Sequence, residues 1–166
     1  LTPSGDLYRP LVILSYAINH TIGGLEPAGY HIVNLLLHAL CTGLVVSLGF
    51  RFGLSMPGAV AAGLLFAAHP IHTEAVAGLV GRAELMAAGA VLAAWRIHLG
   101  SAGAGVRRIA AISGLLLAGL LSKENAVVLP GLMVAGDLWR VRRGEATWRR
   151  TLPACIACGL VILVWL

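Results

Sequence analysis

Charged side chains are scarce in this sequence of 166 residues, because Asp, Glu, Lys and Arg together make up only 11% of it. A typical soluble domain is about one quarter charged. Hydrophobic residues make up 58%, and the mean hydropathy is +0.88. Ala, Leu, Val and Gly account for the excess, which suits helices packed in lipid. The composition argues against an ordinary soluble domain.

Cysteine is also rare, and Cys41, Cys155 and Cys158 all lie in apolar runs. Cys155 and Cys158 have the C-x-x-C spacing of a redox motif, but no βαβ pattern surrounds them. We therefore interpret the cysteines as small packing residues. The sequence has no initiator Met and no basic segment ahead of an apolar run, so it predicts no signal peptide. We expect the chain to be part of a longer one.

Long apolar runs make up most of the chain. The clearest extends from Tyr30 to Gly49, twenty residues without Lys, Arg, Asp or Glu, which is long enough to cross a bilayer as a helix. We predict an all-α fold, a polytopic transmembrane helical bundle, with residues 1–166 forming part of one transmembrane domain. The expected organisation is an outer loop and juxtamembrane helix at 1–29, and spans at about 30–49, 54–68, 82–99, 109–121, 126–138 and 151–166.

Several of these runs are short enough to be buried helices of a soluble protein, and the placement of positive charge decides between the two interpretations. If successive spans alternate in direction, the outer side keeps only Arg9, Arg82 and Lys123. Such a bias over short loops is typical of membrane proteins. It also explains the net charge of +5 better than a nucleic-acid partner does. The inner side receives nine of the 12 Lys and Arg residues: Arg51, Arg96, Arg107, Arg108, Arg140, Arg142, Arg143, Arg149 and Arg150.

Ionisable side chains gather in residues 69–84, which lie on the predicted outer side together with Glu124 and, near the rim, His31. A charge that faces lipid at the centre of a helix costs roughly 2.5–3.5 kcal/mol. We therefore expect these groups to face a polar cavity that opens to the outer side. The ionisable residues of the stretch are His69, His72, Glu74, Arg82 and Glu84.

Each outer cation also has an acid close in sequence, as Asp6 is to Arg9, so simpler roles stay open for several of these groups. Glu124 follows Ser122 at a predicted helix start, where a carboxylate complements the helix dipole. Arg82 and Glu84 could form an ion pair that only anchors a helix. A third simple role is interhelical hydrogen bonding, for three residues that share one helical face: His31, Asn34 and His38.

His69, His72 and Glu74 have a spacing that a metal ion tolerates, but no fourth ligand is evident, so we predict no metal site. Two other features predict packing only. Gly114 and Gly131 each precede an Ala by four residues, a spacing that favours close helix contacts. Pro130 is predicted to kink the helix that contains it.

Five motifs occur in this order along residues 8–140: Tyr8-Arg9-Pro10-Leu11, His31-x-x-Asn34-x-x-x-His38-Ala39-Leu40, His69-Pro70-x-His72-Thr73-Glu74-Ala75-Val76-Ala77, Gly81-Arg82-x-Glu84-Leu85 and Leu121-Ser122-Lys123-Glu124-x-Ala126-Val127-x-Leu129-Pro130. The pattern resembles the membrane domain of the transmembrane-and-tetratricopeptide-repeat protein O-mannosyltransferases and their bacterial relatives. These belong to the GT-C glycosyltransferases. No single motif is specific for this family, but the five motifs in this order are.

The resemblance implies an incomplete GT-C-like bundle whose active site faces the periplasm or the ER lumen, in a bacterial inner membrane or an ER membrane. The expected reaction transfers a sugar, which the resemblance implies is mannose, from a polyprenyl-phosphate carrier to Ser or Thr hydroxyls of a protein acceptor. Membrane lipids are the other expected partners, and no nucleic acid is expected. No cofactor is implied, and dependence on a divalent metal stays open. The family's main catalytic acid is expected upstream of Leu1.

Site roles follow from the resemblance and from the chemistry of the residues, since a hydroxyl needs a general base and a leaving phosphate needs cations. The expected phosphate ligands are Arg9, Arg82 and Lys123. The candidate catalytic carboxylates are Glu74 and Glu84. The expected pocket residues are His31, His69, His72 and Glu124.

Three other functions stay open. A transporter or lipid flippase could use the same polar outer cavity. An intramembrane protease is disfavoured, because Gly53-Leu54-Ser55 lacks the second Gly of a G-x-S-G nucleophile loop. A non-catalytic scaffold would keep the cavity without the chemistry.

Overall fold

The computed structural model describes residues 9–100, 105–144 and 151–165, and the predicted all-α class is confirmed. Six of the helices overlap the apolar segments expected from the sequence. Asp6, Arg149 and Arg150, which the sequence analysis assigned to the two sides of a membrane, lie outside the described residues. The elements in chain order are α1 (Pro10–Gly23), α2 (Pro27–Arg51), α3 (Met56–Ala68), the 3₁₀ helix η1 (Pro70–His72), α4 (Thr73–Ala77), α5 (Arg82–Gly100), α6 (Val106–Leu120), the 3₁₀ helix η2 (Glu124–Val128), α7 (Leu129–Arg142) and α8 (Thr151–Trp165).

Proline marks the beginning of helices rather than kinks within them. Pro10, Pro27, Pro57 and Pro70 each stand in the first turn of an element, where the missing N–H has no intrahelical partner to lose. The kink predicted at Pro130 was wrong for the same reason. The helix α7 begins one residue before Pro130, after the separate 3₁₀ turn η2.

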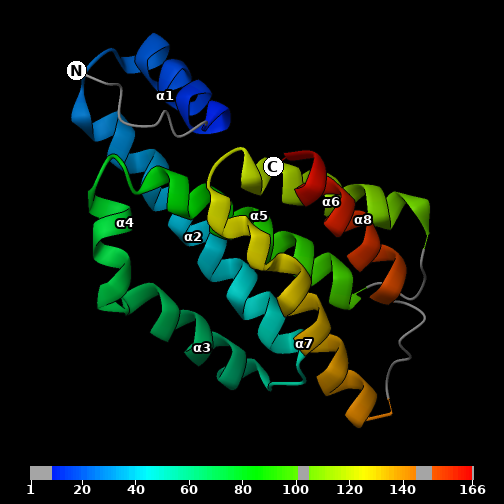
Figure 1. The fold of residues 1–166 in the computed structure, drawn as a ribbon. Coiled ribbons are helices and arrows are strands. Elements are labelled where there is room, and N and C mark those ends of the chain that lie inside the picture. Colours follow the sequence, from blue (N-terminus) through cyan, green and yellow to red (C-terminus); the bar gives the residue numbers. More distant parts are fainter. Residues whose placement is uncertain (1–8, 101–104, 145–150, 166) are drawn as a thin grey trace.

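The helices form a row in which α2 packs between α3 and α5, and α5 packs on α6 and α7 (Figure 1). Helix α8 covers α6 and α7 at the far side. Helix α1 lies beyond the beginning of α2 and contacts a small part of α2 and α5 (Figure 1). The main apolar core lies between α5, α6, α7 and α8, and its largest members are Ile112, Leu116, Leu120, Leu129 and Met133.

Small residues allow close contact between α2 and α3, but not at the glycines that the sequence pattern favoured. A Cβ added to Gly63 on α3 would lie 2.3 Å from the Val46 Cγ2 atom on α2, so a larger residue there would require the Val46 side chain to move. A Cβ at Gly114 or Gly131 would meet no described atom within 4 Å. The packing predicted for these two glycines is therefore not found within the described residues.

Within the described residues, one helix is long and apolar enough to cross a membrane. Helix α2 has 25 residues, with an 18-residue window of mean hydropathy 2.0. The segment Pro70–Ala77 and helix α5 satisfy the same criteria together but meet at an angle of 117°. The apolar helix α3 and the segment Leu152–Trp165 are shorter. In the described part of the chain there are thus one or two candidate spans, and the polytopic bundle stays a prediction.

Large apolar side chains are exposed on α2 and α3, and several polar side chains are buried among the described residues. Soluble monomers rarely expose contiguous apolar patches larger than a few hundred Å². Here the outer surfaces of α2 and α3 expose Ile32, Leu35, Leu36, Leu40, Leu64 and Leu65. The buried polar residues are Asn34, Arg82, His98, Arg108, Ser122 and Asp137.

Most described arginines lie at the end of the bundle where α2, α5 and α7 finish and α6 begins. The Arg140 Nη1 atom donates to the Leu99 carbonyl at 3.0 Å, and a Cβ on Gly100 would lie 2.9 Å from the Arg51 Nη2 atom. Arg9, Arg82 and Lys123 belong to the opposite end, where α1 and α5 begin. The described cations are therefore separated in space as the loop pattern predicted.

A buried polar cluster joins α5, α6 and α7 at the arginine-rich end. The Nε2 atom of His98 lies 2.5 Å from the Asp137 Oδ2 atom, and the Arg108 Nη2 atom lies 2.8 Å from His98 Nδ1. A guanidinium can only donate, so His98 Nδ1 must accept. In this arrangement the His98 Nε2 atom donates its N–H to the Asp137 carboxylate.

Replacing Asp137 with Ala removes the acceptor of this buried hydrogen bond. We expect the free energy of unfolding to fall by about 2–3 kcal/mol, because hydrogen bonds to charged groups contribute about 1.5–3 kcal/mol. Denaturant titration of the detergent-solubilised protein measures the change. Arg142→Ala, at an exposed position on the same helix, serves as the control and should change stability little. Equal midpoints for Asp137→Ala and the wild type would contradict the assignment.

Candidate functional site

A cleft of about 640 Å³ opens at the end of the bundle where α5 begins. Residues of η1, of α4 and of the turn between α4 and α5 form one side of it, and α1 and η2 contribute one cation each. Five of the nine predicted site residues line this cleft: Arg9, His72, Glu74, Glu84 and Lys123.

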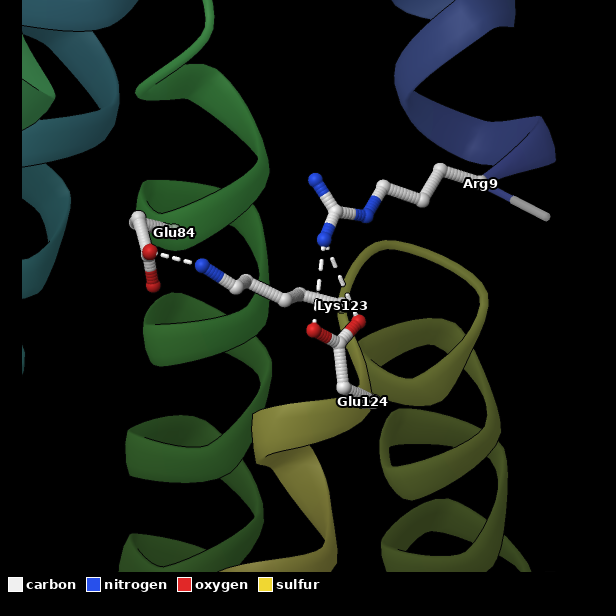
Figure 2. A network of polar contacts seen from close by, with 4 residues as sticks. All are labelled: Arg9, Glu84, Lys123 and Glu124. Atoms are coloured by element: carbon white, nitrogen blue, oxygen red, sulfur yellow. Dashed lines mark hydrogen bonds and ion pairs between the residues drawn. The ribbon is translucent and has the colours of Figure 1, made fainter. Parts of the chain in front are cut away.

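Lys123 and Glu84 form an ion pair across the cleft (Figure 2). Lys123 is the N-cap residue of η2 and has an extended backbone with φ −160°, whereas Glu84 stands in the first turn of α5. The lysine Nζ atom donates to the Glu84 Oε1 atom. The Lys123 side chain is 18% exposed and that of Glu84 is 45% exposed, so the cation is the more enclosed partner.

Arg9 and Glu124 form the second ion pair (Figure 2). The Arg9 Nη2 atom donates to both carboxylate oxygens, at 3.3 and 3.2 Å. A backbone hydrogen bond at Glu124 and, after it, the Arg9 guanidinium lower the pKa of the Glu124 carboxyl, so it is ionised at neutral pH. The buried Arg9 Nε atom has no hydrogen-bond partner among the described residues.

These pairs differ from those that proximity in sequence suggested. Lys123 and Glu124 are neighbours, yet each pairs with a residue of another element. The alternative that Arg82 pairs with Glu84 was wrong, because Glu84 pairs with Lys123 and the hydrogen-bond acceptors of Arg82 are all neutral.

The cleft-lining histidine His72 belongs to a ring cluster. Its ring centroid lies 4.3 Å from that of Phe66, 5.3 Å from His38 and 6.1 Å from His69. The His69 Nδ1 atom accepts from the Ile71 backbone N–H at 3.2 Å and so caps the turn that carries His72. Among the described residues, no group of three or more His, Cys, Asp or Glu side chains could hold a metal ion.

Glu74 differs from the other carboxylate of the cleft. It lies exposed in the first turn of α4 and forms no ion pair or side-chain hydrogen bond with the described residues. Its oxygens are therefore available to accept a hydrogen bond, or a proton, from a molecule bound in the cleft.

Arg82 and His31 do not line the cleft. The Arg82 side chain is fully buried, and all three of its nitrogens donate hydrogen bonds within the protein. Its expected contact with phosphate stays a prediction, which this burial disfavours. His31 lies half-buried on α2 and makes no side-chain hydrogen bond with the described residues.

Interhelical hydrogen bonding is confirmed for Asn34 and His38. The Asn34 Nδ2 atom donates to the Val76 and Gly78 carbonyls at 3.3 and 3.1 Å. The His38 Nε2 atom lies 3.2 Å from the Ala67 carbonyl oxygen. The Asn34 contacts help to fix the segment that forms the cleft wall.

Three polar residues of α1 were missed by the sequence analysis: Ser15, Tyr16 and Asn19. The Tyr16 hydroxyl donates to the Leu79 carbonyl in the turn that lines the cleft, and Ser15 and Asn19 accept from Arg82. The available signal was their spacing of i, i+1 and i+4, which places a polar stripe on one face of an otherwise apolar helix.

An apolar groove of about 540 Å³ adjoins the polar cleft. Helix α1, the beginning of α2 and the turn before α5 form its walls. Arg9, Leu79 and Val80 line both the groove and the cleft. The two spaces are therefore neighbours, one polar and one apolar, that meet at an arginine.

Comparison with known proteins gives consistent matches. The chain is 41% identical to protein O-mannosyl-transferase Tmtc2 of Drosophila melanogaster over 96% of its own length. It is 37% identical over 82% of its length to Tmtc3 of the same organism, and 55% identical over 51% of its length to human TMTC2. The chain is homologous to the TMTC protein O-mannosyltransferases.

The homology covers a small part of each of these O-mannosyltransferases. The chain spans 18% of the length of Drosophila Tmtc2 and 10% of human TMTC2. No protein-family model and no solved structure matches the chain. The expected bacterial type is not supported, because these relatives are animal proteins.

Gly81 tests the shape of the cleft. A Cβ at this position would lie 2.2 Å from the Ala75 carbonyl oxygen and 2.4 Å from the Ala75 Cα atom, and backbone atoms cannot move aside as a flexible side chain can. We expect Gly81→Ala to lower the melting temperature by several degrees, the effect of losing about 1–3 kcal/mol to overpacking.

The matched control is Gly114→Ala on α6, where no described atom lies within 4 Å of the new Cβ. Alanine is favoured over glycine within a helix by roughly 0.5–1 kcal/mol, so this variant should melt at or above the wild-type temperature. The close approach at the cleft is refuted if Gly81→Ala melts together with the control.

Proposed function

We propose that this chain is part of the membrane-embedded domain of a protein O-mannosyltransferase that transfers mannose from a polyprenyl-phosphate carrier to Ser or Thr hydroxyls. The homology to the TMTC proteins supports the reaction class. The apolar outer surfaces of α2 and α3, and the location of most described arginines at the end of the bundle opposite the cleft, support a position in a membrane. The cleft then faces the non-cytoplasmic side.

The observation that carries the proposal is the junction between the polar cleft and the apolar groove. A polyprenyl phosphate has an anionic head and a long hydrocarbon chain, so its site needs cations next to an apolar surface. Arg9 lies where the two spaces meet, and Lys123 lines the polar one. The hydrocarbon chain is the occupant that we assign to the groove.

Lys123 and Arg9 are the proposed phosphate ligands. Each has donors left after its ion pair is made, since Lys123 uses one N–H on Glu84 and Arg9 uses only its Nη2 atom on Glu124. Their carboxylate partners, Glu84 and Glu124, are more exposed than the cations and hold them in place. Lysine provides a compact point charge and arginine a directional fork, which together suit a phosphate.

In the proposed reaction the acceptor hydroxyl oxygen attacks the anomeric carbon of the sugar, and the bond from that carbon to the phosphate oxygen breaks. The hydroxyl proton passes to a carboxylate, for which Glu74 is the candidate within this chain because it is unpaired in the cleft. The phosphate leaves with the bonding electrons, and Lys123 and Arg9 stabilise its negative charge. His72 and His69 would shape the pocket for sugar and acceptor.

Substitution of Lys123 tests the proposal. With the full-length protein, radiolabelled polyprenyl-phosphate mannose and a Ser/Thr-rich peptide, we expect Lys123→Ala to lower kcat/KM roughly 10²–10³-fold, the range found when one charge-stabilising donor is removed. Lys123→Arg should retain part of the activity. Arg107→Ala, at an exposed position on the other end of the bundle, serves as the control and should leave transfer unchanged.

The same experiment separates the proposal from its main competitor, a transporter or flippase. Transfer of label to peptide that depends on Lys123 supports the transferase. Movement of the labelled lipid across the membrane without any transfer to peptide would overturn it, and so would full activity in Lys123→Ala.

A further inference from the structure

Helix α1 has little apolar contact to hold it on the rest of the molecule. Val12 is its one buried residue among those described. Ile13, Leu14, Ile18 and Ile22 are between 52% and 83% exposed. Burial of hydrophobic surface therefore contributes little to the position of α1, and polar contacts must fix it.

The Arg82 guanidinium provides several of those polar contacts. Its Nη1 atom donates to the Asn19 Oδ1 atom at 2.8 Å, to the Ser15 carbonyl at 3.3 Å and to the Ser15 hydroxyl at 3.4 Å. The guanidinium carbon also lies 4.5 Å from the centroid of the Tyr16 ring. All three partners belong to α1, while Arg82 itself begins α5.

The same side chain also binds the beginning of α2. The Arg82 Nε atom donates to the Asn34 Oδ1 atom at 3.0 Å, and its Nη2 atom donates to the Tyr30 carbonyl at 3.1 Å. The guanidinium carbon lies 5.6 Å from the centroid of the Tyr30 ring. One buried cation thus joins α1, α2 and α5, with neutral oxygens and ring faces in place of a carboxylate.

The position of α1 matters because Arg9 is its N-cap residue. Arg9 pairs with Glu124 and lines both the cleft and the groove. At this end of α1 the Leu11 N–H also donates to the Leu121 carbonyl, but this hydrogen bond is long, at 3.4 Å. Movement of α1 would therefore displace Arg9 from the cleft.

We infer that Arg82 is a positioning residue: its guanidinium docks α1 on α2 and α5 and thereby holds Arg9 at the junction of cleft and groove. The effect of Arg82 on catalysis rests on the proposed function. Its effect on the docking of α1 does not, so the two are tested by separate measurements.

The first measurement is hydrogen–deuterium exchange of the full-length protein. Arg82→Lys keeps the charge but lacks the planar fork that reaches three helices, so we expect faster exchange in residues 9–23 with α6 and α7 unchanged. Asn19→Leu removes a partner on α1 while leaving the contacts of Arg82 with α2, and should reproduce the change. Arg107→Ala is the control. Unchanged exchange of α1 in both Arg82→Lys and Asn19→Leu would overturn the inference.

The second measurement is a double-mutant cycle on transfer kinetics. A displacement of about 1 Å costs about 10²-fold in rate, so we expect Arg82→Lys to lower kcat/KM for the lipid donor by up to that factor, with the KM for the peptide unchanged. If Arg82 acts through Arg9, then Arg82→Lys has little further effect in an Arg9→Ala background. If the double mutant instead loses kcat/KM by the product of the two single-mutant factors, the inference is contradicted. If the wild type transfers no mannose, the proposed function fails. Hydrogen–deuterium exchange of α1 then tests by itself whether Arg82 docks that helix.

Discussion

A guanidinium taken out of water must find hydrogen-bond acceptors for its N–H groups, because an unpaired buried charge is severely destabilising. Arg82 finds them on α1 and α2 while standing at the first position of α5. The three helices must therefore meet in one arrangement. That arrangement brings the beginning of α1 to η2 and places the turn before α5 beside it, and residues of these elements line the cleft.

The two ends of the bundle use charge in different ways. At the arginine-rich end, His98 links Asp137 to Arg108 inside the core. At the cleft, the pairs Lys123–Glu84 and Arg9–Glu124 are partly exposed. Exposed pairs contribute little to stability, roughly 0–1 kcal/mol. Their value lies in holding two cations at fixed places beside a space that a ligand can enter.

Much of the architecture follows from the sequence, because apolar runs without charged residues have few alternatives to helices. The distribution of Lys and Arg between alternating loops also predicted one common side of the membrane for five residues that line one cleft: Arg9, His72, Glu74, Glu84 and Lys123. Their roles stay predictions. The spans do too, since α6 and α7 have only 15 and 14 residues.

The pairing of the site residues could not be predicted. Lys123 and Glu124 are adjacent, but the extended backbone of Lys123 sends its side chain to Glu84, 39 positions away in sequence. The burial of Arg82 was equally hidden, because its acceptors are neutral and lie 48 to 67 positions away. Sequence patterns favour charged partners nearby, whereas a buried guanidinium is satisfied by whatever oxygens the folded chain supplies.

The proposed function requires that the cleft and the arginine-rich end face opposite sides of a membrane. Labelling of single cysteines with a membrane-impermeant maleimide in sealed vesicles tests it most directly, in full-length protein whose native cysteines are replaced. We expect Thr73→Cys and Val127→Cys to react only from the non-cytoplasmic side, and Arg107→Cys and Arg142→Cys only from the cytoplasmic side. Reaction of all four positions from the same side would contradict the account.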